Sequence, residues 1–447
     1  MASTKQCFIE EIVEPIRLYN VPHHSNDGDG DTRAVPVEQH SISDFDVLSS
    51  RLDSMRGREH VYRFISICQR NSWRPLQITV SMFKLLIEKL SLNNSIRDIV
   101  SFFYMRNMHT EEVLSMPYNE RRKGSVVEAS YTLRYPEHKP DLDKWVIRQT
   151  GVYHRCDSTS GQTLFIMFNP VPNAKASITA AEWLSSRVQG SDTDPVWLHK
   201  ILLETYFPAW RFYIASLERQ FLPLSYNTLV NFINEPSTLN PSHLTTLVNL
   251  SNHFLTTSSI LNSSEETLRE LSNLCAHCLK GTNADLLQES TSEFENFQRQ
   301  CRIFSRTATD LYHRVQTTSQ LLANTLSFRE QLDSRKQNEN MLRLNKSVVF
   351  ITTLTLLYLP PSFIATFFGM NFFDMDSVTG RIISSPMIWI YVLVSVLLTT
   401  ATFGTYYTMR EGSFLNAKVS GLRALSWRGL FYRKQHNKDV ELDDLPV

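Results

Sequence analysis

The sequence is poor in cysteine, glycine and proline, and neither sign of charge is in excess. Its 447 residues include 6 cysteines, 14 glycines and 18 prolines. Cysteines this sparse and irregularly spaced predict no disulfide framework and favour a reducing compartment. So little glycine and proline argues against a mostly disordered chain. Lysine plus arginine and aspartate plus glutamate each number 45, so the overall charge indicates no nucleic-acid partner.

Motifs of enzymatic chemistry are also missing. We find no phosphate-binding loop, nucleophile elbow or set of four metal ligands, and we therefore predict no enzyme, no catalytic residue and no cofactor. Cys275 and Cys278 lie in a helical segment without a second pair at zinc spacing. A metal or redox pair remains an alternative there, but two small apolar residues on a packing face is the favoured interpretation.

Two long uncharged segments near the C-terminus are the most distinctive feature that the chain does have. They cover Ser347–Phe368 and Ile382–Met409, and each exceeds the roughly 20 helical residues that cross a bilayer core. Aromatic residues suited to a membrane interface flank the second segment: Trp389, Tyr391, Tyr406 and Tyr407. Two transmembrane helices are predicted, and two buried helices of a soluble core are the alternative.

Basic residues predict the orientation of these spans. Lysines and arginines precede the first span and follow the second, whereas the loop between them holds only Arg381. Because positive residues stay on the cytoplasmic side, both termini should be cytoplasmic. The N-terminus MASTKQCFIEEIVEP resembles no cleaved import signal, which leaves the plasma membrane or another endomembrane.

One face of the first span is small and partly hydroxylated. Steps of three and four residues give Asn345, Val348, Ile351 or Thr352, Thr355, Leu359, Ser362 and Thr366. This face is predicted to pack on protein or to line a pore, and hydroxyls bonding back to their own helix are the alternative. Pro360 and Pro361 lie in the same span and should kink it.

A long helix is predicted to lead into the first span. No glycine or proline occurs from Thr282 to Leu359. Residues spaced three and four apart form a heptad seam: Phe294, Phe297, Cys301, Phe304, Ala308, Leu311, Val315, Thr318, Leu322 and Thr325. Such a helix needs flanking helices or copies of itself, and segments 194–224 and 243–280 are helical by periodicity.

The predicted fold class is an α+β membrane protein. Apolar runs and alternation predict strands at 60–69, 76–80, 126–135, 144–155 and 163–170, and a hairpin over 145–168. The expected organisation is a disordered segment (1–45), a mixed α/β cytoplasmic domain (46–180), a helical layer and stalk helix (181–345), two transmembrane helices (346–410) and a basic cytoplasmic tail (411–447).

The arrangement of these segments resembles the CorA family of magnesium channels. The stretch FFGMNFFDMD follows a proline-kinked first span and precedes a second span and a basic tail, and the detailed match covers residues 345 to 410. The residues that carry it are Pro360, Phe363, Ile364, Gly369, Met370, Asn371 and Phe372. This sequence departs from the family pattern at Leu359 and Ser362, where relatives have methionine and threonine, and at the additional Pro361.

The resemblance implies a homopentamer that passes Mg²⁺ with its hydration water. Gly369, Met370 and Asn371 would form the outer mouth, where five Asn371 carboxamides bind the metal through its waters. The pore-lining positions would be Asn345, Val348, Ile351, Leu359 and Ser362, with Val348 and Ile351 as an apolar constriction. Asp374 and Asp376 would be acids of the outer loop that raise the local cation concentration.

Two alternatives keep this fold and change the activity. The same channel would carry zinc or another divalent cation, although the intact Met370–Asn371 pair favours magnesium. A non-conducting membrane scaffold or sensor would assemble without ion flux. No acids of this sequence match the family's regulatory magnesium sites, so closure by internal magnesium is expected without assigned residues.

Overall fold

The computed structural model describes residues 4–22, 37–55, 60–106, 114–186, 194–230, 240–279, 284–367, 373–375, 382–384 and 388–408. The chain divides into two compact units, Met1–Ser327 and Phe328–Val447. The long helix α8, Ala284–Phe367, contributes residues to both units. The predicted mixed α/β part, long helix and two apolar C-terminal helices are all confirmed.

A seven-stranded sheet forms the centre of the first unit. Its order is β2-β1-β3-β7-β6-β5-β4. Only the β3–β7 pair is parallel, and the other neighbours are antiparallel. The strands are β1 Ile16–Pro22, β2 Glu38–Ile42, β3 His60–Cys68, β4 Asn119–Lys123, β5 Val126–Lys139, β6 Lys144–Asp157 and β7 Thr163–Asn169. The predicted β6–β7 hairpin is confirmed.

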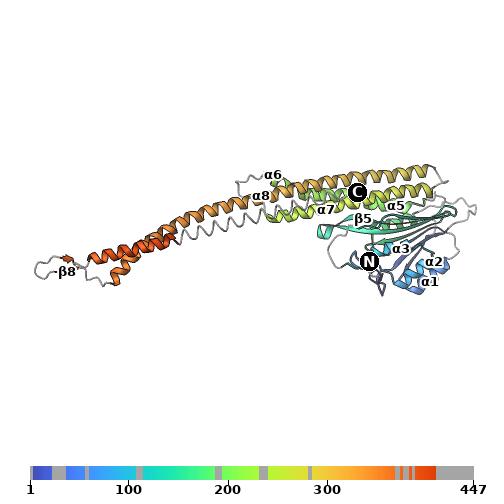
Figure 1. Ribbon diagram of the computed structural model, residues 1–447. Coiled ribbons are helices and arrows are strands. Elements are labelled where there is room, and N and C mark those ends of the chain that lie inside the picture. The colour runs from blue at the N-terminus through green and yellow to red at the C-terminus, as the bar shows by residue number, and fades with distance from the viewer. Residues whose placement is uncertain are drawn as a thin grey trace, which may run out of the picture. The chain divides into compact units, whose positions relative to one another are not determined.

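Helices cover both faces of this sheet (Figure 1). Side chains of a strand alternate between the two faces, so neighbouring residues such as Phe165 and Ile166 enter different cores. One face packs on α1 Phe45–Ser54, α2 Val80–Lys89 and α3 Ser95–Ser101. The other packs on α4 Lys175–Ser185, α5 Trp197–Tyr206, α6 Ala209–Val230, α7 Pro241–Cys278 and α8.

Close packing of α3 depends on Gly151 in β6. A Cβ atom at this position would lie 2.4 Å from Ile99 Cγ2 and 3.0 Å from a ring carbon of Phe103. A contact of 2.4 Å is far inside van der Waals range, so glycine allows α3 to approach the sheet.

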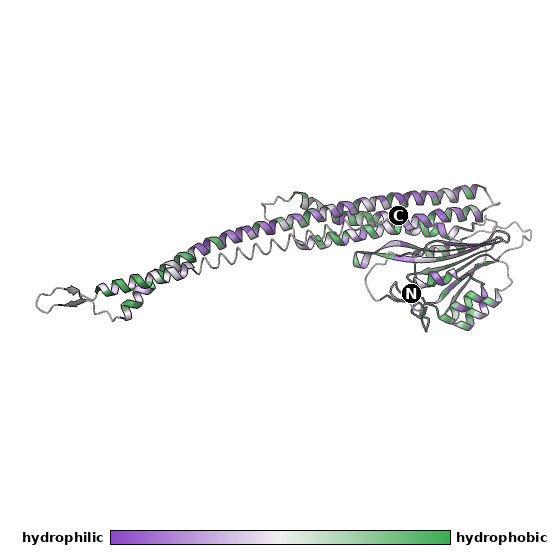
Figure 2. Ribbon diagram, viewed as in Figure 1, coloured by the Kyte–Doolittle hydropathy of each residue, from purple (hydrophilic) through white to green (hydrophobic). Residues whose placement is uncertain are grey.

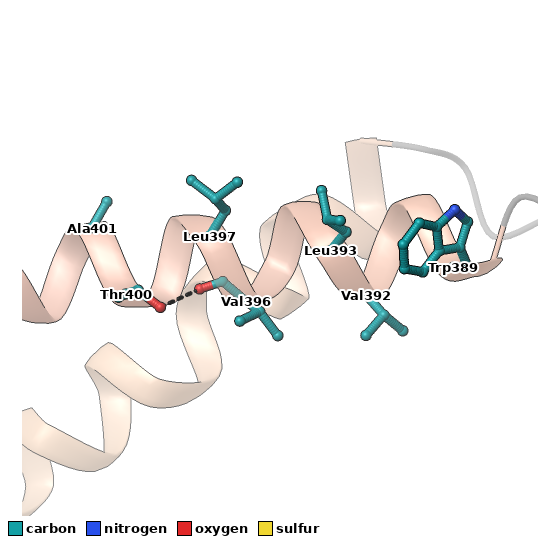
Figure 3. Close-up of a pocket in the computed structure, with 7 residues that line it drawn as sticks. All are labelled: Trp389, Val392, Leu393, Val396, Leu397, Thr400 and Ala401. Atoms are coloured by element: carbon teal, nitrogen blue, oxygen red, sulfur yellow. Dashed lines mark hydrogen bonds between the residues drawn. The ribbon is translucent and has the colours of Figure 1, made fainter.

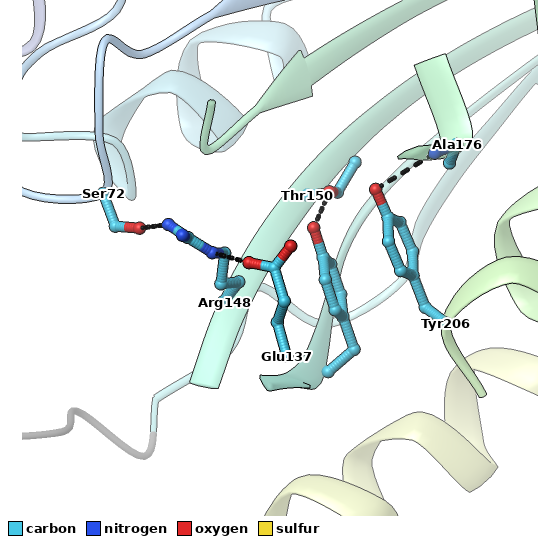
Figure 4. A network of polar contacts seen from close by, with 7 residues as sticks. Ser72, Glu137, Arg148, Thr150, Ala176 and Tyr206 are labelled. Carbon is cyan, nitrogen blue, oxygen red and sulfur yellow. Dashed lines mark hydrogen bonds and ion pairs between the residues drawn. The ribbon is translucent and has the colours of Figure 1, made fainter. Parts of the chain in front are cut away.

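A polar network crosses the other side of the β5–β6 pair (Figure 4). Arg148 donates to Glu137 and to Ser72, which ties β6 to the loop after β3. Tyr135 stacks on Tyr206 of α5 with ring centroids 3.6 Å apart. Tyr206 Oη also accepts a hydrogen bond from the Ala176 backbone amide at 3.2 Å. These contacts attach α4 and α5 to the sheet.

The predicted heptad seam is the packed side of α8 in the first unit. Phe294, Cys301, Ala308, Leu311, Val315 and Leu322 are each at most 3 % exposed. The Phe207 ring contacts the rings of Phe297 and Phe304, with centroids 5.3 and 6.0 Å apart. A polar layer joins α7 to α8, where Ser258 Oγ lies 3.1 Å from Ser305 Oγ. Flanking helices of the same chain therefore bury this seam.

Two sequence predictions for the first unit are wrong. Residues 1–45 were expected to be disordered, yet they contain β1 and β2. β2 pairs only with β1 and is half exposed, so its sequence lacks the apolar alternation of an inner strand. The strand predicted at 76–80 is not formed: Leu76 makes only isolated bridges to Phe8 and Gln69, and the side chain of Thr79 caps α2 by accepting from Met82 N at 3.2 Å. The helical character predicted for 194–224 is confirmed, and the segment forms two helices, α5 and α6.

The second unit contains the C-terminal part of α8 and a helix over Ile388–Thr408. Figure 2 shows the last part of α8 and this second helix as predominantly hydrophobic. Between them, β8 Phe373–Met375 pairs with β9 Ile382–Ser384 in an antiparallel hairpin.

Candidate functional site

Both helices of the second unit are long and apolar enough to cross a membrane. Large apolar side chains along them are exposed, including Phe350 at 67 %, Phe363 at 61 % and Leu397 at 65 %. A helix in the core of a soluble protein would bury such residues, because each large apolar side chain gains roughly 1.5–3 kcal/mol on burial. The exposure argues for lipid or further protein around both helices and against the soluble-core alternative.

The predicted pore-lining positions lie on one face of α8. Taking each helical residue to turn about 100°, they fall within an arc of about 120°. All five are exposed: Asn345, Val348, Ile351, Leu359 and Ser362. Each chain thus presents a continuous face with an amide at one end and a hydroxyl at the other, and apolar residues together with Thr352 and Thr355 lie between them.

The packed side of α8 in this unit lies roughly opposite that face. Pro360 and Ile364 are buried, and at about 100° per residue they point some 120–160° away from the centre of the predicted pore face. Tyr391 Oη of the second helix donates to the Pro361 carbonyl oxygen at 3.4 Å. The second helix therefore covers the proline turn and leaves the predicted pore face uncovered.

The contact that Tyr391 makes with α8 was not predicted from the sequence. Its position near the start of the second span suggested an aromatic of the membrane interface. It is partly buried and hydrogen-bonded to the proline turn of α8. Pro360 and Pro361 leave the carbonyls of Leu356 and Leu357, four residues earlier, without their usual donors, whereas Tyr391 donates to the carbonyl of Pro361 itself. The prolines therefore did not signal this contact.

Threonine hydroxyls on α8 bond back to their own helix. Thr352, Thr355 and Thr366 donate to the carbonyl oxygens of Val348, Ile351 and Ser362 at 2.8–2.9 Å. This was the alternative interpretation of the hydroxylated face, and the structure confirms it for these donors. Each hydroxyl oxygen keeps acceptor lone pairs, so the face still offers acceptors to water.

The second helix presents an apolar surface away from α8 (Figure 3). It is formed by Trp389, Val392, Leu393, Val396, Leu397, Thr400 and Ala401. Its hydroxyl, on Thr400, donates to the Val396 carbonyl oxygen at 2.7 Å, and the indole of Trp389 lies at one end. A surface whose hydroxyl is satisfied within the helix and which ends in a tryptophan suits lipid.

The predicted outer mouth, Gly369, Met370 and Asn371, lies outside the described residues, as does Asp376. Asp374 is in β8, where it pairs with Ile383 of β9. The hairpin thus places the backbone of one outer-loop acid within the connection between the two apolar helices.

Metal-binding clusters of three or more histidines, cysteines or acids are absent from the part of the chain that the structure describes. Cys275 and Cys278 are both buried in α7. Both belong to the hydrophobic core of the first unit, and burial raises the pKa of the Cys275 thiol to about 11. This position agrees with the favoured interpretation of two small apolar residues on a packing face.

Two family models match the sequence. The model described as CorA-like Mg²⁺ transporter protein matches residues 189–404. The model described as CorA-like transporters matches residues 16–229. Their overlap joins the sheet, the helical layer and both apolar helices into one continuous match. No curated protein sequence matches the chain.

Several solved structures are similar to the chain. The complete CorA magnesium transporter from Methanocaldococcus jannaschii is 13 % identical, with 89 % of this chain and 98 % of that one covered and a TM-score of 0.39. The full-length CmaX protein is 12 % identical over 90 % and 98 % of the two chains, with a TM-score of 0.37. The ZntB cytoplasmic domain from Vibrio parahaemolyticus is 8 % identical over 73 % and 100 %, with a TM-score of 0.34.

Proposed function

The chain belongs to the CorA-like Mg²⁺ transporter family, and from this premise we propose that it is a channel for hydrated Mg²⁺. As a family member it is an integral membrane protein that transports divalent cations and not an enzyme. In the proposal, five copies assemble around an axis, and Mg²⁺ enters the cytoplasm down its electrochemical gradient without covalent chemistry.

The observation that carries the proposal is the exposed face of α8. Its five predicted pore positions share one side of the helix, roughly opposite the side that Tyr391 and the second helix contact. In a ring of subunits that face would be turned to the axis, and the apolar outer surface of the second helix would meet lipid. The first spans then line the pore and the second spans surround them.

In the proposal, a ring of Asn371 side chains selects the ion, and Gly369 and Met370 hold this ring in position. Mg²⁺ gives up its hydration water reluctantly, so amide oxygens suit it as acceptors for the hydrogens of bound water. Asp374 and Asp376 in the outer loop would concentrate cations near this ring. Val348 and Ile351 would form an apolar constriction that gates the pore by excluding water.

In the proposed orientation of the chain in the membrane, both termini lie in the cytoplasm. Basic residues flank the two spans at the same membrane side, and the connecting loop carries only Arg381. Mg²⁺ would therefore meet the Asn371 ring from outside and leave past Asn345 into the cytoplasm.

The test is Mg²⁺ uptake into dye-loaded proteoliposomes, comparing the native chain with Asn371→Ala at equal incorporation. We expect uptake by the native chain and a loss of about tenfold or more in the variant, equivalent to about 1.4 kcal/mol of lost interaction with the ion. Asn252→Ala is the matched control, because Asn252 is exposed on α7 outside the apolar helices.

Two other results would replace the proposal with a named alternative. Zn²⁺ or Ni²⁺ uptake without Mg²⁺ uptake would mean that the same fold carries a different divalent cation. Absence of all uptake by a correctly folded oligomer would identify a membrane scaffold or sensor.

A further inference from the structure

A row of mostly polar residues crosses the whole sheet of the first unit on the face that packs on α1, α2 and α3. Strand pairing places one residue of every strand in this row, in the order Glu38, Asn20, Arg63, Leu164, Arg155, Glu128 and Arg121. Cross-strand neighbours share a face, so three arginines and two glutamates lie on a surface whose other positions, such as Ile65 and Ile166, are apolar core.

A cavity of about 540 Å³ opens at the β4 end of this row. Its walls come from β4, β5, β6 and the turn between α2 and α3, and its polar lining includes Asn93, Arg121, Lys123, Glu128, Arg155 and Asp157. The volume lies within the roughly 300–1,000 Å³ of sites for small organic ligands. Three cations and two carboxylates thus converge on a space of metabolite size.

The two carboxylates already have donors from the protein. Glu128 Oε1 accepts from Tyr153 Oη at 2.7 Å. Asp157 accepts from the Thr159 backbone amide at 3.0 Å and from Ser160 Oγ at 2.9 Å. These contacts hold the two carboxylates at the walls of the cavity, where the three cations outnumber them.

The cations, in contrast, keep unused donors. Arg155 Nη1 donates to the Leu90 carbonyl oxygen at 2.6 Å, and Arg121 Nη1 to Asn93 Oδ1 at 3.4 Å. A guanidinium has five N–H donors, so most of them remain. Lys123 forms no ion pair with any residue that the structure describes, and it is exposed at the edge strand.

Arg63, next in the row beyond Leu164, adds buried positive charge. It is 6 % exposed, and its Nε donates to Asn20 Oδ1 at 3.3 Å. Its Nη2 has no hydrogen-bond partner among the described residues. Burial and the nearby Arg155 lower the pKa of Arg63 to about 10. Arg63 and Arg155 therefore repel each other across one strand, and a bound anion would relieve this repulsion.

We propose that the cavity binds a small phosphate-bearing metabolite of nucleotide size, whose phosphate group is held by Arg121, Lys123 and Arg155. Planar guanidinium groups match the oxygens of a phosphate in bidentate geometry. Inorganic phosphate alone would leave most of 540 Å³ unfilled, so an organic part is expected to occupy the space toward His60 and Leu92. The site lies in the first unit and does not depend on the proposed transport activity.

The experiment is isothermal titration of the full-length chain in detergent with AMP, adenosine and inorganic phosphate. We expect AMP to bind, inorganic phosphate to bind more weakly and adenosine not to bind. In Arg121→Ala/Lys123→Ala the AMP affinity should fall by about tenfold or more, because two charge-assisted contacts are lost. Both residues are exposed on β4, and an unchanged thermal midpoint without ligand will verify folding.

Lys144→Ala is the matched control, since Lys144 is an exposed lysine at the opposite end of β6. It should leave AMP binding unchanged. Absence of AMP binding, equal binding of adenosine and AMP, or full AMP affinity in the double variant would each overturn the proposal. Heat of binding requires no ion flux, so these results are independent of whether the chain conducts.

Discussion

At the scale of single residues, two adjacent valines of α8 separate the predicted pore face from its surroundings. Val348 lies on that face, and the side chain of Val349 is turned about 100° from that of Val348. Both are exposed in the single chain, at 57 % and 41 %. Because their side chains are identical, they form a matched pair for testing which side of α8 meets the pore.

We predict that Val348→Asn increases Mg²⁺ uptake several-fold, because an amide in the constriction keeps it wetted and lowers the barrier to a hydrated ion. Val349→Asn should leave uptake near the native rate. Both rates are measured in dye-loaded proteoliposomes at equal incorporation. If Val349→Asn raised uptake and Val348→Asn did not, the pore face would be assigned to the wrong side of α8.

Two buried histidines in the first unit predict how its stability depends on pH. His199 Nε2 lies 3.1 Å from His154 Nδ1, and Tyr131 Oη lies 2.7 Å from His199 Nδ1. Burial lowers the pKa of His199 to about 3. Burial, together with the neighbouring His199, lowers the pKa of His154 well below its ordinary value. Both imidazoles are therefore neutral in the folded chain at neutral pH.

Protonation of the unfolded chain gives the sign of this dependence. Free histidine has a pKa near 6.5, so below that value the unfolded chain binds protons that the folded chain does not. The free energy of unfolding should therefore fall as the pH drops from about 6.5 toward 3, with up to about 1.4 kcal/mol lost per pH unit for each histidine.

We expect His199→Gln to reduce the decrease in thermal midpoint between pH 7.5 and pH 5.5, because one of the two titrating groups is removed. The measurement is thermal unfolding of the full chain in detergent, followed by intrinsic fluorescence. His313→Gln, at an exposed position of α8, should keep the native pH dependence. A decrease of the same size in His199→Gln would contradict the role of the buried pair.

At the scale of elements, α8 shows what the sequence could and could not predict. The lack of glycine and proline from 282 to 359 and the heptad seam predicted one long helix, and its bounds are Ala284–Phe367. Pro360 and Pro361 lie within the helix and do not end it. The sequence also predicted which side of the helix is buried in the first unit, because the apolar period is strong there.

Strands β1 and β2 were not predicted from the sequence, and the reason is physical. β2 has the sequence EQHSI and lies at the sheet edge, where only one neighbouring strand constrains it. The burial of β2 depends on pairing with β1 across a long connection. The residues of β2 alone do not indicate that pairing. The polar row and its cavity were also not predictable, because they arise from the register of seven strands.

The packing of α8 in the first unit predicts unequal effects of two leucines. Leu311 is 3 % exposed, whereas Leu321 is 40 % exposed. Leu311→Ala should reduce the free energy of unfolding by about 2–5 kcal/mol, because a buried leucine leaves a cavity. Leu321→Ala should change it by no more than about 0.5 kcal/mol. Thermal midpoints of the full chain will compare the two, and equal midpoints would contradict the assignment of the buried face.

At the scale of the whole molecule, the distribution of charge along the sequence is more informative than the total charge. The 45 basic and 45 acidic side chains cancel, yet the stretches Ser347–Phe373 and Ile382–Met409 contain no charged residue. This segregation predicted both membrane helices. The proposed pore needs several copies of the chain, and each copy would contribute the exposed face of α8 to it.

The central claim is that the assembled chain conducts Mg²⁺ down an electrochemical gradient. The most direct test is the initial rate of Mg²⁺ entry into dye-loaded proteoliposomes at a series of membrane potentials set by potassium gradients. A conducting pore predicts entry that accelerates as the interior becomes more negative, because each Mg²⁺ carries two charges through the field. Entry that does not change with potential, or no entry at any potential, would contradict the account.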